Sequence, residues 1–338
     1  MNAFGAEFPQ VRQRRTRSSS FARKLVRENL ISTDDLIYPI FLIDGTGKEI
    51  PVDSMPDICR ISIDNLSRVA SDCLKKGINA VALFPNISSD KKSEDGKEAY
   101  NEKGLIPRAL NLLKRDFPEL GVITDAALDP YTTHGQDGVV DETGYVLNDP
   151  TVTILQKQAL CYAAAGADII APSDMMDGRI KGIRSALELE GFVNTILLAY
   201  SAKYASSFYG PFRDAVGSAK TLQRRGKETY QLDIGNISEA LREVELDLKE
   251  GADIVMVKPG LPYLDVVRAI TTEFKVPTFV YQVSGEYSML KAAFQNNWLD
   301  QKSAMLESLT SFKRAGASAI LTYFALEAAD EIKKRSRG

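Results

Sequence analysis

Four short segments of the chain repeat the same junction between a helical pattern and an apolar run. They begin at Ala165 (Ala-Gly-Ala-Asp), Glu250 (Glu-Gly-Ala-Asp), Ala315 (Ala-Gly-Ala-Ser) and, more loosely, Lys76 (Lys-Gly-Ile-Asn). Glycine fits the left-handed position that ends a helix, and a buried strand follows each glycine. A repeated helix–glycine–strand unit with tight connections predicts a (β/α)₈ barrel, an α/β fold also called a TIM barrel.

The apolar pattern supports this fold, because eight strand candidates alternate with helical segments. The expected strands cover residues 36–43, 80–84, 121–125, 167–173, 194–203, 251–258, 277–284 and 319–323. The expected helices cover residues 63–76, 106–117, 151–165, 180–190, 238–250, 263–274, 302–315 and 327–334. A doubly wound open sheet is the alternative, and the lack of a GxGxxG motif after the first strand weakens it.

The first 33 residues differ from the rest of the chain. Residues 11–20 are basic and contain few apolar side chains, whereas residues 21–30 have apolar positions at helical spacing. We therefore divide the chain into an N-terminal arm, residues 1–33, and a barrel, residues 34–338. The arm is expected either to be a disordered tail or to pack on a partner subunit, and the helical spacing favours the second.

Composition excludes several classes of function. The net charge of −3 and pI of about 5.5 give no sign of nucleic-acid or membrane binding. No apolar run approaches the roughly 20 residues that a membrane span needs, and the N-terminus lacks an apolar signal core. Three scattered cysteines suit a reducing cytoplasm and argue against a thiolate zinc site.

Two of the expected strands end in a lysine, Lys203 and Lys258. Burial disfavours a charged ammonium and lowers its pKa, and a neutral amine attacks carbonyl groups to form a Schiff base. A strand-end lysine that extends to water is the alternative for either one alone. If the two strands are neighbours, mutual repulsion lowers both pKa values further, which predicts two amine nucleophiles at one site.

Catalytic residues of a (β/α)₈ barrel lie at the carboxyl ends of its strands. Six consecutive expected strands end in a polar side chain, namely Asp125, Ser173, Lys203, Lys258, Ser284 and Tyr323. Any one of them could arise by chance, but six that converge on one end of a barrel predict a site.

Three loops add further candidates. The loop 125–138 is rich in aspartate and contains the only histidine, which fits either a Mg²⁺ or monovalent-cation site, a general acid–base set, or a polar turn. The loop 204–235 is long enough for a lid, and its Arg213 and Lys227 could bind substrate carboxylates or be solvated. Residues 171–179 supply a serine and two aspartates, or simply a turn.

Six motifs together resemble the 5-aminolevulinate dehydratase (porphobilinogen synthase) family from about residue 8 to the C-terminus. They are Asp-Pro-Tyr-Thr-Thr-His-Gly-Gln-Asp-Gly (129–138), Ala-Pro-Ser-Asp-Met-Met-Asp-Gly-Arg (171–179), Tyr-Ser-Ala-Lys-Tyr-Ala-Ser (200–206), Tyr-Gly-Pro-Phe-Arg-Asp-Ala (209–215), Met-Val-Lys-Pro-Gly (256–260) and Tyr-Gln-Val-Ser-Gly-Glu-Tyr (281–287). The resemblance implies the condensation of two 5-aminolevulinate molecules to porphobilinogen, with loss of two waters, in haem biosynthesis.

The resemblance also implies a role for each site residue. Lys258 would bind the substrate that supplies the propionate side, and Lys203 the one that supplies the acetate side. The residues implied around them are Arg213, Lys227 and Gln231 for the acetate-side carboxylate, Ser284 and Tyr323 for the propionate-side carboxylate, Asp125 and Ser173 for the amines, and Phe212 as a wall.

The chain departs from the zinc-dependent members of this family, which carry three cysteines in the loop after the third strand. Those positions are Ala127, Asp129 and Asp137 here, so no active-site zinc is expected. Asp129 and Asp137 could instead hold a monovalent cation or Mg²⁺, or no ion at all. Resemblance to the magnesium-responsive members implies an allosteric Mg²⁺ at Glu243. Without the resemblance, we would interpret Glu243 as an exposed helix carboxylate. The resemblance also implies a homo-octamer in which the N-terminal arms of paired subunits embrace.

Two other functions compete with this one. A Schiff-base aldolase would use only one of the two lysines, and a non-catalytic barrel would bind a ligand or a partner. The polar residues at the expected strand ends argue against the second.

Overall fold

The computed structural model describes residues 7–217 and 226–336. The chain divides into residues 1–30 and residues 31–338, and each unit is described by itself. The long loop 204–235 therefore lies partly outside the described residues, and the prediction of a lid is not addressed there.

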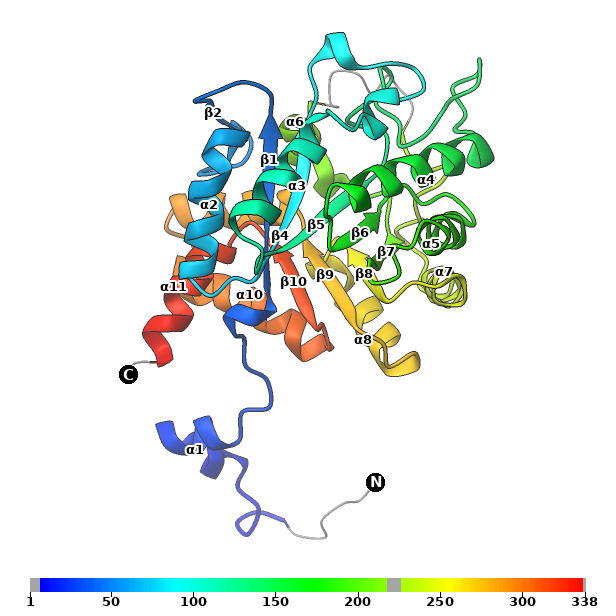
Figure 1. The fold of residues 1–338 in the computed structure, drawn as a ribbon. Helices are drawn as coiled ribbons and strands as arrows, with labels where there is room; N and C mark the ends of the chain where they lie inside the picture. Colours follow the sequence, from blue (N-terminus) through cyan, green and yellow to red (C-terminus); the bar gives the residue numbers. More distant parts are fainter. Residues whose placement is uncertain (1–6, 218–225, 337–338) are drawn as a thin grey trace. The chain divides into compact units, whose positions relative to one another are not determined.

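Eight parallel strands form a closed barrel within residues 31–338 (Figure 1). The strands are β1 (Leu36–Ile43), β4 (Ala80–Asn86), β5 (Gly121–Ala126), β6 (Ile169–Pro172), β7 (Ile196–Lys203), β8 (Ile254–Lys258), β9 (Thr278–Gln282) and β10 (Ala319–Thr322). The first strand pairs with β4 on one side and with β10 on the other, which closes the barrel. The pairing of β1 with β10 ends at Ile37, before Pro39, which has no backbone N–H to donate.

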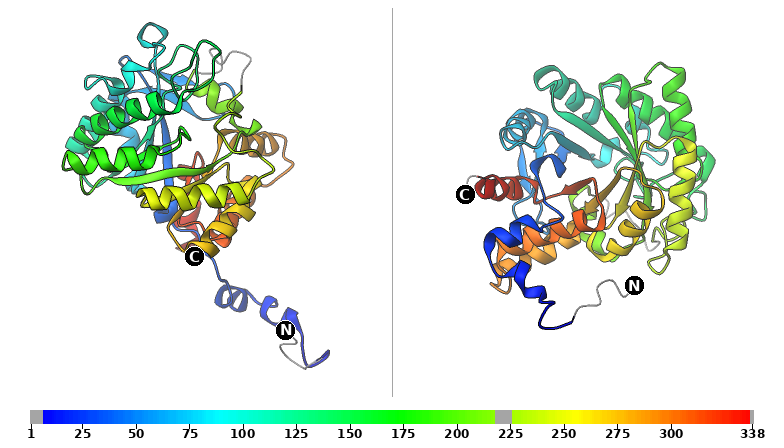
Figure 2. Two further views of the ribbon diagram at one scale, coloured as in Figure 1. Left: turned by 90° about the vertical axis from the view of Figure 1, so that its right-hand side faces the viewer. Right: turned by 90° about the horizontal axis from the view of Figure 1, so that it is seen from below.

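Helices surround these strands, as the two views of Figure 2 show. The helices after successive strands are α2 (Ile63–Lys75), α3 (Leu105–Asp116), α4 (Asn148–Ala164), α5 (Arg179–Leu189), α7 (Ser238–Glu250), α8 (Leu264–Glu273), α10 (Gln301–Ala315) and α11 (Ala325–Ser336). The predicted glycine stops are confirmed at Gly251 (φ +106°) and Gly316 (φ +115°), which adopt the left-handed conformation after α7 and α10. The (β/α)₈ prediction is therefore correct.

Among the described residues of the barrel unit, two strands and two α-helices were not expected from the sequence. Two short strands, β2 (Glu49–Pro51) and β3 (Cys59–Ser62), extend the sheet beside the carboxyl end of β1. Two helices, α6 (Gly210–Ala215) and α9 (Ser284–Gln295), follow β7 and β9. These strands have three or four residues and α6 has six, which is too short for periodicity to be visible. The predicted strand 277–284 is also wrong at its end, because a helix begins at Ser284.

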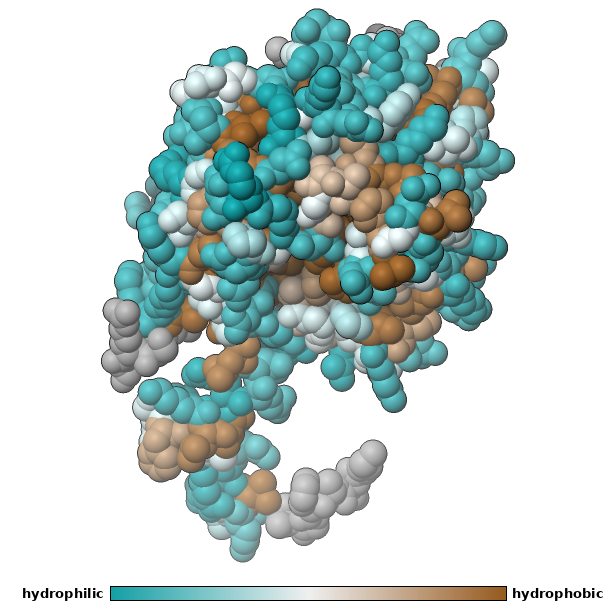
Figure 3. Space-filling model, viewed as in Figure 1, coloured by the Kyte–Doolittle hydropathy of each residue, from teal (hydrophilic) through white to brown (hydrophobic). Residues whose placement is uncertain are grey.

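The N-terminal unit contains one short α-helix among its described residues, α1 (Ser20–Leu25), which is shorter than the 21–30 segment expected. Hydrophobic side chains on and after it are exposed, with Phe21 at 70% and Leu25 at 79%. Figure 3 shows a brown, hydrophobic area on the surface of the N-terminal unit. Within the described residues, no helix combines the length and the hydrophobicity that a membrane span requires.

The junction of α9 with the segment after β7 allows no side chain at Gly285. A Cβ there would lie 2.5 Å from the backbone oxygen of Phe208, and a backbone atom cannot give way as a flexible side chain can. We expect Gly285→Ala to lower the free energy of unfolding in urea by about 1–3 kcal/mol.

Gly210→Ala is the matched control. A Cβ at Gly210 meets nothing within 4 Å, and this residue begins α6 with helical backbone angles. This variant should be as stable as the parent chain, and a Gly285→Ala protein of unchanged stability would contradict the close packing described here.

Candidate functional site

Two lysines lie side by side at the carboxyl ends of neighbouring strands. Lys203 ends β7 and Lys258 ends β8, and the two residues are directly paired in the parallel register. Each is only 5% exposed. The predicted juxtaposition of two buried amines is therefore present, and we call the two side chains and the groups that contact them the lysine site.

Aromatic rings surround the amine of Lys258. Its Nζ lies 4.5 Å from the ring centre of Tyr281, 4.8 Å from that of Phe212, 5.1 Å from that of Tyr200 and 5.4 Å from that of Tyr209. Burial lowers the pKa of Lys258 to about 7, and the nearby positive charge of Lys203 contributes. A substantial fraction of this amine is thus unprotonated at neutral pH, as a nucleophile requires. Phe212, which the resemblance implied as a wall of the site, lies beside Lys258, and the three tyrosines were not predicted.

Lys203 has polar neighbours instead. Its Nζ donates a hydrogen bond to the backbone carbonyl of Ser173, which follows β6, and lies 3.6 Å from a carboxylate oxygen of Asp137. The expectation of two uncharged amines is thus supported at Lys258, while Lys203 lies in an ion pair. The difference arises because the loop after β5 brings a carboxylate within ion-pair distance of Lys203, whereas rings lie closest around the Nζ of Lys258.

Asp125, at the end of β5, lies near both amines. Burial raises the pKa of Asp125 to about 6, against the opposing charges of Lys258 and Lys203. One of its oxygens, Oδ1, accepts no hydrogen bond from the described residues. The site therefore contains a buried carboxyl group that can change protonation near neutral pH beside two amines.

A lysine occupies the space between the two aspartates that the sequence offered as cation ligands. The Nζ of Lys227 lies 2.9 Å from Asp137 and 3.3 Å from Asp129. Burial opposes ionisation of Asp137, yet the charges of Lys203 and Lys227 lower its pKa to about 2. Burial raises the pKa of Asp129. The ammonium group of Lys227 thus lies between the two carboxylates, in the place that a bound cation would need.

The other predicted clamp residues lie on segments beside this cluster. Gln231 is buried, and its Oε1 accepts no hydrogen bond from the described part of the chain. Arg213 follows Phe212 on α6. Burial lowers the pKa of Lys227, but the carboxylates of Asp129 and Asp137 outweigh burial, and the pKa is raised. The positive charge of Arg213 opposes this rise. Arg213 is thus near enough for its charge to act on Lys227.

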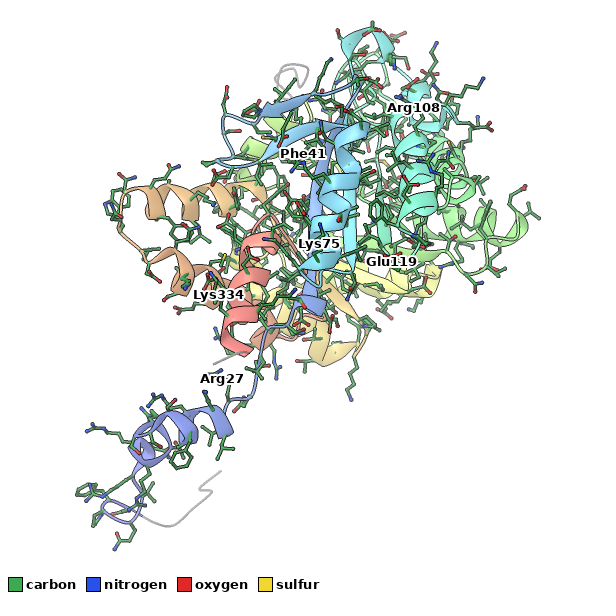
Figure 4. All side chains as sticks on the ribbon, turned by 60° about the vertical axis from the view of Figure 1, so that its left-hand side comes forward. Arg27, Phe41, Lys75, Arg108, Glu119 and Lys334 are labelled. Carbon is green, nitrogen blue, oxygen red and sulfur yellow. The ribbon has the colours of Figure 1, made fainter. Side chains whose placement is uncertain are left out.

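Ser284 and Tyr323 lie on the Lys258 side of the site. Ser284 Oγ accepts a hydrogen bond of 2.8 Å from the backbone N–H of Phe212. The hydroxyl of Tyr323 lies 2.8 Å from that of Tyr281, whose ring faces Lys258. Tyr323 also stacks on Phe41, which is labelled on β1 in Figure 4. Both predicted residues are therefore connected to the surroundings of Lys258.

Glu286 is a buried residue that the sequence reasoning missed. Its carboxylate accepts hydrogen bonds from the backbone N–H groups of Gly260, Leu261 and Val283 at 2.6–3.1 Å. Burial raises the pKa of Glu286 to about 7, although these three bonds oppose the rise. The residue joins the turn after Lys258 to the first turn of α9. A glutamate two residues after Ser284 in a helical first turn is the signal that could have identified it.

Glu243, on α7, lies apart from the lysines. It lines a cavity of about 250 Å³ together with Gln231, Tyr230 and Glu239, among others. The buried Arg179 lies 3.6 Å from its carboxylate. Burial raises the pKa of Glu243 to about 7, with Arg179 in opposition. Glu243 is thus partly buried rather than an ordinary exposed carboxylate. Among the described residues, no group of three or more His, Cys, Asp or Glu side chains is arranged to hold a metal.

Comparison with known proteins assigns a family. A sequence model described as delta-aminolevulinic acid dehydratase matches residues 10–331. The delta-aminolevulinic acid dehydratase of Bradyrhizobium diazoefficiens is 54% identical over 323 residues, which cover 96% of this chain and 91% of that protein. The enzyme of the same name from Archaeoglobus fulgidus is 48% identical and covers 97% of this chain and 100% of its own length.

A solved structure agrees. The delta-aminolevulinic acid dehydratase (porphobilinogen synthase) of Toxoplasma gondii, crystallised with its reaction product porphobilinogen, superposes with a TM-score of 0.95 at 49% identity. The match covers 97% of this chain and 93% of that one.

The lowered pKa of Lys258 has a measurable consequence. We expect its acetylation by acetic anhydride to rise as pH increases through about 7, because only the neutral amine reacts. Peptide mapping at each pH measures the reaction. Lys249, which is exposed and pairs with Glu245, is the reference. A Lys258 whose labelling rises only near pH 10, the range of an ordinary lysine, would contradict the described surroundings.

Proposed function

The chain belongs to the delta-aminolevulinic acid dehydratase family, and from this membership we infer that the lysine site joins two molecules of 5-aminolevulinate into porphobilinogen with loss of two waters. The protein is accordingly an enzyme, a hydro-lyase of tetrapyrrole biosynthesis. The observation that carries the assignment to particular residues is the direct pairing of Lys203 with Lys258 at the ends of β7 and β8.

Lys258 is proposed to form a Schiff base with the ketone of the propionate-side substrate, and Lys203 with that of the acetate-side substrate. Each ketone oxygen leaves as water when its Schiff base forms. Formation of one C–C and one C–N bond between the substrates then displaces both lysine amines, which accounts for the two waters lost. Asp125 and Ser173 are proposed to lie against the substrate amino groups, a role that fits the proximity of both to the lysines.

The two substrate carboxylates need separate partners. We assign the acetate-side carboxylate to Arg213, Lys227 and Gln231, and the propionate-side carboxylate to Ser284 and Tyr323. The pairing of Lys227 with Asp129 and Asp137 means that an incoming carboxylate competes with these aspartates for the ammonium group. A site with one cationic clamp and one hydroxyl clamp suits a pair of substrates that bind in different orientations.

Mg²⁺ is proposed to bind at Glu243 as an allosteric ion. Mg²⁺ keeps several of its waters and uses one or two carboxylates, so a single glutamate on a cavity of about 250 Å³ is compatible with a hydrated ion. No zinc is expected at the lysine site, since Ala127, Asp129 and Asp137 supply no thiolate. A monovalent cation between the two aspartates is disfavoured by Lys227.

Assembly and location complete the proposal. The exposed apolar residues of the arm support a role in subunit contacts, within a homo-octamer. Three unpaired cysteines support a cytoplasmic location.

The two-lysine mechanism predicts the outcome of borohydride trapping. Reduction in the presence of 5-aminolevulinate should attach substrate to both Lys203 and Lys258, as peptide mapping would show. Lys258→Ala should lower porphobilinogen formation, measured with Ehrlich's reagent, by about 1,000-fold or more while circular dichroism stays unchanged. Substrate attached to one lysine only would favour the single-lysine aldolase instead.

The metal proposal predicts a response to chelators. EDTA should lower activity and added Mg²⁺ should restore it, whereas a zinc-selective chelator should have little effect. Glu243→Ala should abolish the response to Mg²⁺, whereas Glu245→Ala, an exposed neighbour on α7 that pairs with Lys249, should keep it. A requirement for zinc in the metal-stripped enzyme would refute this part of the proposal.

A further inference from the structure

The short helix α6 is held at its carboxyl end by a residue far away in the sequence. Arg60, on β3, donates hydrogen bonds from Nε to the carbonyl of Ala215 and from Nη2 to the carbonyl of Asp214, both at 2.7 Å. The same Nη2 lies 3.3 Å from the Asp214 carboxylate. Ser54 Oγ donates to the other oxygen of that carboxylate at 2.7 Å. Three groups of α6 are thus bound by the β2–β3 region.

These bonds reinforce the carboxyl end of α6, where the carbonyl of Asp214 also accepts a bond of 3.1 Å from the N–H of Gly217. The last carbonyls of a helix have no intrahelical donor, and a positive charge is favourable at that end. Asn86, at the end of β4, donates a further bond of 2.8 Å to the carbonyl of Ala215. A helix of six residues is too short to be stable alone, so contacts such as these determine where it lies.

The position of α6 matters because of the side chains on it. Phe212 places its ring 4.8 Å from the Nζ of Lys258 and packs against Phe41 and Phe84. Arg213 is the next residue. The other end of the helix is fixed by the bond from the Phe212 N–H to Ser284 Oγ. Arg60 therefore fixes the opposite end of a segment that contributes two side chains to the lysine site.

We propose that Arg60 is a positioning residue for the condensation: its guanidinium group binds the last carbonyls of α6 and thereby sets the place of Phe212 and Arg213. The proposal rests on the function proposed above for Arg213. A lysine at position 60 cannot make all of these contacts, because an ammonium group lacks the planar guanidinium fork that binds two carbonyls and a carboxylate together. Arg60 touches neither lysine, so its effect is transmitted through the backbone of α6.

The test compares Arg60→Ala and Arg60→Lys with Arg68→Ala. Arg68 is also near β3, but it pairs with Glu49 on the surface. We expect Arg60→Ala to lower kcat/KM for 5-aminolevulinate by about 10- to 100-fold, mainly through KM, because a displaced Arg213 binds the substrate carboxylate poorly. Arg60→Lys should recover part of the loss, and Arg68→Ala should behave like the parent enzyme. Trapping of substrate at Lys258 should persist.

A double variant distinguishes the positioning role of Arg60 from the carboxylate-binding role of Arg213. In an Arg213→Ala background, Arg60→Ala should raise KM no further. An equal rise in both backgrounds would show that Arg60 acts elsewhere and would overturn the proposal. A normal KM in Arg213→Ala alone would instead remove the clamp role of Arg213.

Hydrogen exchange provides a readout that is independent of substrate. Arg60→Ala should speed amide exchange in residues 210–217 at least several-fold, with Arg68→Ala unchanged. Unaltered exchange there would overturn the proposal. If Arg60→Ala does not fold, Ser54→Ala removes only the hydroxyl that binds Asp214, and it should change KM and exchange in the same direction to a smaller extent. No effect of Ser54→Ala or Arg60→Lys on either measurement would likewise overturn it.

Discussion

The burial of two amines at adjacent strand ends is the constraint on which the rest of the site depends. Removing an ammonium group from water is costly, so each lysine must lose its proton or gain a carboxylate. Here the two lysine side chains have different surroundings. Lys258 lies among aromatic rings and has a pKa of about 7, whereas Lys203 faces Asp137 at 3.6 Å. The barrel supplies the same position twice, and the loops make the two positions chemically unequal.

That inequality suits a reaction between two identical molecules. If both lysines had the same surroundings, nothing in the protein would distinguish the two substrates. Asp137 lies within ion-pair distance of Lys203, and Asp129 and Asp137 both lie within that distance of Lys227. On the other side the neighbours are hydroxyl groups and rings, including Tyr323. Ion pairs are thus concentrated around Lys203 and Lys227, whereas aromatic rings predominate around Lys258, with Asp125 near both strand-end lysines.

The sequence was sufficient to predict the fold and to place Asp125, Lys203 and Lys258 at strand ends. It was insufficient where several segments must meet. Glycine junctions and apolar runs predicted all eight barrel strands, because both signals are local. Tyr200 and Tyr281 lie within buried strands, where an aromatic residue looks like core. Arg60 lies on a strand of four residues, and its partners are about 155 residues away. The ion pair of Lys203 likewise depends on the position of the loop that contains Asp137, and the spacing of residues in the sequence does not predict that position.

The tyrosines around Lys258 show why such residues have more than a packing role. An aliphatic shell would exclude water and would disfavour every positive charge equally. Aromatic rings exclude water as well, but their faces attract a cation within about 6 Å. Four rings lie within 5.4 Å of this Nζ. Water exclusion keeps the free amine partly neutral, while the ring faces stabilise the cationic state that protonation or imine formation produces. The pKa of Lys258, about 7, results from burial and the charge of Lys203, which lower it, and from the carboxylates of Asp125, Asp129 and Asp137, which raise it.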